Sequence, residues 1–181
     1  MKTDARIRYT RMAIKKSFIS LINEKPVNKV TVKDVCDRAE INRATFYKHY
    51  KDCFDLLERI ESEMIDQLKQ LVREAQGKSM STMFEKMFMK IKNESDLYLT
   101  VASDNGDTGL PSRILNMFYK EAHPYFEVLL RGNSNQREDW LYYFVANGCA
   151  GILSYWINTG MKENTKEMAD YISKMIDKST Q

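Results

Sequence analysis

The stretch from Thr31 to Tyr50 (T-V-K-D-V-C-D-R-A-E-I-N-R-A-T-F-Y-K-H-Y) predicts two very short helices separated by a tight turn. Thr31 is a favourable N-cap, and Asp34 is the acidic partner expected three residues later in a capping box. Asn42 is a second N-cap, which opens a helix from Arg43 to Tyr50. Two short helices joined by a turn of about three or four residues form a helix-turn-helix, whose second helix can enter the major groove of DNA.

The distribution of charge points to the same partner. Residues 1–53 hold 13 Lys and Arg against 6 Asp and Glu, whereas the rest of the chain holds 15 against 19. A basic N-terminal segment (the head) followed by an acidic remainder of the chain (the body) is typical of a protein whose head binds nucleic acid. Small basic faces are common in proteins, so it is the coincidence with the two-helix pattern that favours DNA.

Composition predicts an all-α fold. The 181 residues include seven Gly and three Pro, and the chain is rich in helix formers such as Leu, Met, Lys and Glu. With 43% hydrophobic and 29% charged residues, it resembles an ordinary globular protein. Apolar residues recur at helical spacing, and about nine helices are expected in total. Those outside the helix-turn-helix should cover residues 4–24, 51 or 52 to 75, 80–93, 95–103, 111–130, 138–159 and 166–178.

The sequence also argues against several classes of function. No apolar run approaches the roughly 18 residues of a membrane span, and the charged N-terminus has no signal-peptide core. The three cysteines are widely spaced and the two histidines lie far apart, which argues against a disulfide framework or a metal site. No nucleophile–base pair, phosphate loop or catalytic carboxylate pair is evident. We therefore expect a cytoplasmic protein that is not an enzyme and has no catalytic residues, metal or cofactor.

The last two expected helices carry more apolar residues than a surface helix of a small monomer needs. The first of them is apolar over more than one face and contains the small-residue segment G-C-A-G at 148–151. Gly148 and Gly151 lower helix propensity, which close approach of another helix would offset. These helices either close a monomeric core or form a four-helix dimer interface. Helix-turn-helix proteins bind paired DNA half-sites as two-fold symmetric pairs, which favours the homodimer.

The helix-turn-helix, with the F-D-L-L that opens the next helix, resembles the TetR family of transcriptional regulators. The T-F-Y-x-H-Y core at residues 45–50 is highly specific for that family, and the resemblance covers roughly residues 5–60. It implies a DNA-binding domain over residues 1–51 and a helical effector-binding and dimerisation domain over residues 52–181. The C-terminal segment from Gly151 onwards resembles a TetR subgroup that includes activators of dihydroxyacetone utilisation.

The resemblance implies that this head binds double-stranded operator DNA. Arg43, Ala44 and Tyr47 match positions that face bases or the adjacent sugar-phosphate. Arg43 is expected to read a base, because an Arg fork on guanine is the commonest specific contact. His49 matches a phosphate contact, with a capping or packing imidazole as the alternative. The positions that match phosphate contacts are Thr31, Thr45, Lys48, His49 and Lys51.

Three residues depart from the family pattern. Glu40 stands where Gly is usual in the turn, so this residue must either adopt an unusual backbone angle or shift the turn. Cys53 stands where Lys is usual at the start of the connecting helix, which leaves one phosphate contact without its usual residue. Asn42 replaces a common Ser and exchanges one N-cap for another.

The resemblance further implies a dimeric repressor that a small-molecule effector, bound in the helical body, releases from a palindromic operator. An activator whose body responds to a protein partner is the alternative. Apolar and aromatic side chains of the body could line an effector pocket, although the same set also describes a hydrophobic core. The residues assigned to the pocket are Met87, Phe88, Tyr98, Phe118, Tyr119, His123, Phe144 and Trp156.

Overall fold

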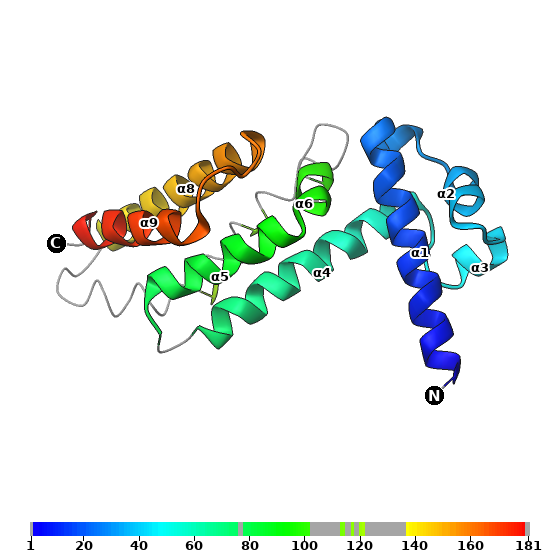
Figure 1. Ribbon diagram of the computed structural model, residues 1–181, viewed down its shortest axis with the longest axis horizontal. Helices are drawn as coiled ribbons and strands as arrows, with labels where there is room; N and C mark the ends of the chain where they lie inside the picture. The colour runs from blue at the N-terminus through cyan, green and yellow to red at the C-terminus, as the bar shows by residue number, and fades with distance from the viewer. Residues whose placement is uncertain are drawn as a thin grey trace. The chain divides into compact units, whose positions relative to one another are not determined.

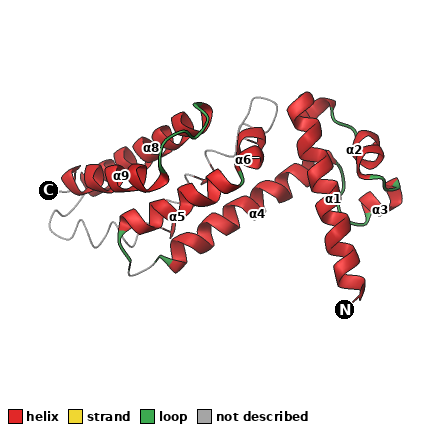
Figure 2. Cartoon of the chain, in the orientation of Figure 1, coloured by secondary structure: helices red, strands yellow, loops and turns green. Residues whose placement is uncertain are grey.

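The computed structural model describes residues 2–75, 78–101, 113, 114, 117, 120, 121 and 137–179. These residues contain eight α-helices and one short 3-10 helix, and no strand occurs among them (Figure 2). The prediction of an all-α fold is therefore confirmed. The helices are α1 (Lys2–Glu24), η1 (Val27–Lys29), α2 (Val32–Ala39), α3 (Arg43–Tyr47), α4 (Cys53–Glu74), α5 (Met80–Asn93), α6 (Ser95–Val101), α8 (Arg137–Asn158) and α9 (Thr165–Ser179).

The chain divides into two compact units. Unit 1 spans residues 1–64 and 99–110, and unit 2 spans residues 65–98 and 111–181. The boundaries fall inside α4 and α6, so these two helices run from one unit into the other (Figure 1).

Unit 1 is built around a core shared by α1, α2, α3 and the first half of α4. α1 packs on α2, and α2 packs on α3. Helix α4 belongs to this core because its first apolar residues point inward, so the unit extends beyond the helix-turn-helix itself. The fully buried side chains of this core include Ile14, Phe18, Ile22, Val35, Phe46 and Leu56.

Unit 2 is held mainly by the packing of α5 against α9, with α8 beside α9 (Figure 1). The Ser81 hydroxyl of α5 donates to the Asp170 carboxylate of α9. On the C-terminal half of α4, Lys69 and Arg73 pair with Glu121 at 3.0 and 2.8 Å. The buried side chains shared by α5, α8 and α9 include Met83, Met87, Phe88, Ile91, Trp156, Ala169, Ile172 and Ile176.

Most expected helix boundaries lie within two residues of the observed ones, but α3 is shorter than predicted. It ends at Tyr47 instead of Tyr50. The Tyr50 N–H still donates to the Phe46 carbonyl at 3.0 Å, which closes one more turn. Asp52 then N-caps α4 by accepting from the Asp55 N–H at 2.8 Å, so the chain leaves the axis of α3 before residue 52.

Two expected helices extend into residues that the structure does not describe. The helix expected over 95–103 is described as far as Val101. Of the helix expected over 111–130, the structure describes five residues, and all five are helical.

Candidate nucleic-acid interface

The start of α2 is fixed by the capping box predicted from the sequence. The Asp34 N–H donates to Thr31 Oγ1 at 3.1 Å, and the Thr31 N–H donates to Asp34 Oδ2 at 2.9 Å. Lys25 Nζ donates to the same carboxylate at 2.8 Å. The Lys25 bond, followed by the Thr31 N–H bond, lowers the pKa of Asp34 to about 2. Thr31 is exposed, so its O–H proton is still available to a phosphate.

The turn between α2 and α3 requires a left-handed residue, and Glu40 supplies it. Its φ and ψ are 53° and 42°. The Ile41 N–H donates to the Cys36 carbonyl at 3.0 Å, and the Glu40 N–H donates to the Asp37 backbone carbonyl at 3.4 Å. This is a Schellman motif, in which Gly is the usual residue at the left-handed position. Of the two alternatives, the unusual backbone angle is the one that occurs.

The second helix begins at its predicted cap. Asn42 Oδ1 accepts from the Thr45 N–H at 2.8 Å and from the Thr45 hydroxyl at 2.9 Å. While that second bond persists, Thr45 can offer DNA only the lone pairs of its hydroxyl, which do not bind a phosphate oxygen. No sequence pattern indicates this bond, because it depends on the rotamer of Thr45.

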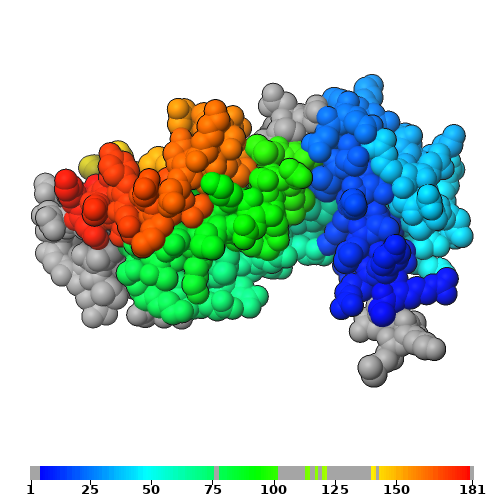
Figure 3. Space-filling view, viewed as in Figure 1, coloured from blue at the N-terminus to red at the C-terminus, as the bar shows by residue number. Residues whose placement is uncertain are grey.

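The three residues expected at the bases share the exposed surface of α3. Arg43, Ala44 and Tyr47 are all exposed, whereas Phe46 on the opposite side is fully buried. In the space-filling view, α2 and α3 (light blue to cyan) form an outer face of unit 1 (Figure 3). Helix α3 thus presents side chains of the types that read base edges.

The residues after α3 present more cations. Lys48 and Lys51 are exposed, and His49 is half-buried with its ring 6.3 Å from that of Tyr50. The Lys51 N–H donates to Asp55 at 2.9 Å, which fixes the backbone that carries its ammonium group.

Cys53 is not part of the exposed surface. It is buried, and burial raises the pKa of its thiol to about 11, so it remains neutral. The neighbouring Phe54 is exposed at the start of α4, which the apolar spacing of this helix did not predict.

Four of the residues assigned to an effector pocket lie in the interior of unit 2. Met87, Phe88, Tyr98 and Trp156 are buried, and the rings of Phe88 and Trp156 meet edge to face at 5.3 Å. Phe144 does not join them, because it is 69% exposed on α8. The other three assigned residues (Phe118, Tyr119 and His123) lie outside the described part of the chain.

Two kinds of feature are absent from the described segments. They contain no group of three or more His, Cys, Asp and Glu side chains that could hold a metal ion. None of their helices is long and apolar enough to cross a membrane.

A capped first helix, a left-handed turn and an exposed second helix at the basic end of an all-α chain define a helix-turn-helix DNA-binding regulator. Residues 19–60 match the family model described as "Bacterial regulatory proteins, tetR family". Residues 78–178 match the model described as "Transcriptional regulator C-terminal region". The chain therefore belongs to the TetR family of transcriptional regulators, which bind operator DNA and are not enzymes.

A curated relative is the uncharacterized HTH-type transcriptional regulator YxbF of Bacillus subtilis (strain 168). It is 37% identical over 70 residues, which cover 36% of this chain and 18% of that protein. A TetR regulator from Streptococcus agalactiae 2603V has a similar structure, with a TM-score of 0.71, 23% identity and coverage of 97% and 98% of the two chains.

Two further structures share the fold. The dihydroxyacetone kinase operon activator DhaS has a TM-score of 0.65 at 15% identity, covering 92% of this chain and 93% of that one. The fatty acid degradation regulator FadR from Bacillus halodurans has a TM-score of 0.67 at 12% identity, covering 92% and 94%. At these identities the likeness shows the fold alone.

Proposed function

We propose that the protein is a homodimeric repressor, which a small-molecule effector releases from a palindromic operator in the cytoplasm. Residues 1–51 would contact DNA, and residues 52–181 would bind the effector and pair the two copies through α8 and α9. The proposed DNA contacts come from the N-cap of α2, from α3 and from the residues that follow α3, with Thr45 taking part once its hydroxyl turns away from Asn42. They are Thr31, Arg43, Ala44, Thr45, Tyr47, Lys48, His49 and Lys51.

Two buried polar groups in unit 2 support the proposal that an effector binds there. Tyr98 is 2% exposed and Trp156 is 1% exposed. Neither the Tyr98 hydroxyl nor the Trp156 Nε1–H has a hydrogen-bond partner in the part of the chain that the structure describes. A buried donor without a partner costs about 1–3 kcal/mol, so each such group calls for an explanation. An acceptor atom of a ligand would satisfy either donor.

The surroundings of these donors indicate the chemistry of the effector. Burial raises the pKa of the Tyr98 phenol, which therefore stays protonated and can donate. The buried residues of α5 in the same unit are apolar, and a charged ligand among them would lose its hydration without a counter-ion. A neutral, mainly apolar molecule with a carbonyl, ether or hydroxyl oxygen fits these conditions.

The test begins with the operator, which can be selected from random DNA with the wild-type protein. Neutral apolar compounds that carry an acceptor oxygen are then screened for release of that operator by fluorescence anisotropy. Tyr98→Phe should weaken release by an active compound about three- to tenfold, as expected for one lost hydrogen bond. Tyr171→Phe, at a position 65% exposed on α9, is the matched control. The proposal fails if Tyr98→Phe and the control respond alike.

An exposed aromatic surface on α8 and α9 supports a second candidate, an activator that binds a protein partner. Trp140, Phe144, Tyr155 and Tyr171 are each more than half exposed. In vitro transcription from the selected operator distinguishes the two signs of regulation, because a repressor lowers transcript yield and an activator raises it.

A further inference from the structure

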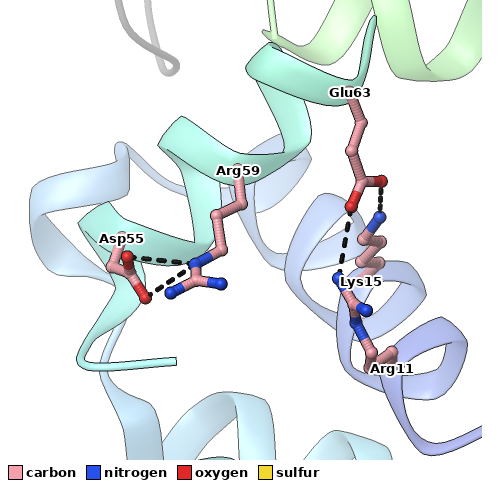
Figure 4. Close-up of polar contacts among 5 residues, drawn as sticks. All are labelled: Arg11, Lys15, Asp55, Arg59 and Glu63. Carbon is pink, nitrogen blue, oxygen red and sulfur yellow. Dashed lines mark hydrogen bonds and ion pairs between the residues drawn. The ribbon is translucent and has the colours of Figure 1, made fainter. Parts of the chain in front are cut away.

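Helix α4 carries a stripe of polar side chains at four-residue spacing, formed by Asp55, Arg59 and Glu63 (Figure 4). All three residues belong to unit 1. Residues four apart lie on one face of a helix, so the stripe can act as a single surface. Its two ends contact different elements of the DNA-binding head.

The N-terminal end of the stripe holds the segment that follows α3. The Asp55 carboxylate accepts from Arg59 Nε at 3.1 and 3.2 Å and from the Lys51 N–H at 2.9 Å. The Arg59 guanidinium lies over the Tyr50 ring at 5.7 Å. Tyr50 in turn packs on Phe46, the buried residue of α3, with ring centroids 5.7 Å apart. This end therefore holds the segment that joins α3 to α4.

The C-terminal end of the stripe holds α1. The Glu63 carboxylate pairs with Arg11 at 3.4 Å and also with Lys15 (Figure 4). Lys15 is partly buried, and its burial, followed by the nearby charge of Arg11, lowers the pKa of its ammonium group. The Glu63 carboxylate thus compensates the positive charges of Arg11 and Lys15, and the Lys15 ammonium group is poorly hydrated because it is partly buried.

We propose that Glu63 is a positioning residue for operator binding. It fixes α1 on α4. Because α1 packs on α2 and α2 packs on α3, this attachment determines the position of α3, the helix proposed to contact bases. Glu63 itself is negative and acts through α1, not on DNA. The inference rests on the DNA-binding activity of the family and is independent of the effector and of the sign of regulation.

The proposal predicts an effect opposite in sign to simple electrostatics. Glu63→Gln removes a negative charge from the head and frees two cations, which by charge alone should tighten binding to every DNA sequence. If Glu63 positions α1, the same change should instead weaken binding to the selected operator about three- to tenfold. Binding to unrelated DNA should stay equal or become tighter, so the ratio of specific to non-specific affinity falls.

Glu58→Gln is the matched control. Glu58 lies on the same helix and is exposed, and its side chain has no hydrogen bond or ion pair in the described part of the chain. The control removes the same charge without touching α1, so operator affinity should hold or rise slightly. If Glu63→Gln binds the operator as tightly as Glu58→Gln does, Glu63 has no positioning role.

Exchanging the charges of Glu63 and Lys15 provides a second test of the positioning role, which does not depend on a single variant. Glu63→Lys should weaken operator binding more than Glu63→Gln, because it places a third cation beside Arg11 and Lys15. Combining it with Lys15→Glu restores an opposite-charge pair and should recover most of the lost specificity. Thermal unfolding of each variant separates loss of the fold from loss of position. A folded double variant that binds as weakly as Glu63→Lys would overturn the proposal.

Discussion

Arg43, at the exposed start of α3, is the side chain whose loss should most change sequence preference. A bidentate contact to a base contributes about 1–3 kcal/mol of discrimination, so Arg43→Ala should relax preference at one operator position by that amount. Lys48→Ala should instead weaken binding to all sequences and reduce the salt dependence by about one phosphate contact. Titration of operator variants at several salt concentrations measures both. An Arg43→Ala protein with unchanged affinity and preference would contradict the base-reading assignment.

Residue roles could be predicted from the sequence where they depend on near neighbours. The caps at Thr31 and Asn42 occur as expected, because a capping side chain bonds to a backbone group three residues away. Cys53 shows the limit of inference from the family pattern. Its thiol is buried on the apolar face of α4 with Leu56 and Leu57, whereas the match to a family Lys had placed this position among the phosphate contacts.

At the scale of elements, the turn between α2 and α3 stores strain at Glu40. An L-residue in the left-handed region costs about 1–2 kcal/mol, and Gly avoids most of this cost while losing some chain entropy. We therefore expect Glu40→Gly to raise the free energy of unfolding by about 0.5–1 kcal/mol, as measured by urea denaturation.

A glycine placed within α2 provides the comparison for this prediction. Lys33 is exposed in that helix, and Lys33→Gly should lower the free energy of unfolding by about 1 kcal/mol. If both glycine variants are destabilised alike, the left-handed conformation of Glu40 is not a source of strain.

Contacts between elements were less predictable than the elements themselves. The apolar spacing of α4 predicted its length to within two residues. The stripe of Asp55, Arg59 and Glu63 was missed, since charged residues on a helix usually face solvent. Its role follows from the crossing of α1 over α4, which brings Arg11 to Glu63 from a position far along the chain.

At the scale of the whole molecule, α8 presents a surface that none of the described residues covers. Trp140, Phe144, Gly148, Gly151 and Tyr155 follow one another at spacings of three or four residues and so share one face of the helix. The three aromatic side chains are 68–71% exposed. Within the described chain, no heavy atom outside the local helix lies within 4 Å of a Cβ placed on either glycine. The close helix approach expected at these glycines is therefore not made there.

We propose that a second copy of the chain covers this stripe. Glycines allow two helices to approach closely, and the aromatic side chains beside them supply apolar area to bury. A two-fold pair also matches the paired half-sites that helix-turn-helix dimers bind. We expect the protein to sediment as a dimer at micromolar concentration. Phe144→Glu and Gly151→Leu should each shift it towards monomer, one by burying a charge and the other by blocking the approach. Both should also weaken operator binding, because a monomer engages one half-site.

Phe54→Glu is the control for sedimentation, because it places the same charge at an exposed aromatic position of unit 1. It should leave the dimer intact. A wild-type protein that remains monomeric at micromolar concentration would contradict the dimer. The aromatic stripe of α8 would then still be uncovered, and this outcome would favour the activator, whose partner protein would occupy the stripe instead of a second copy.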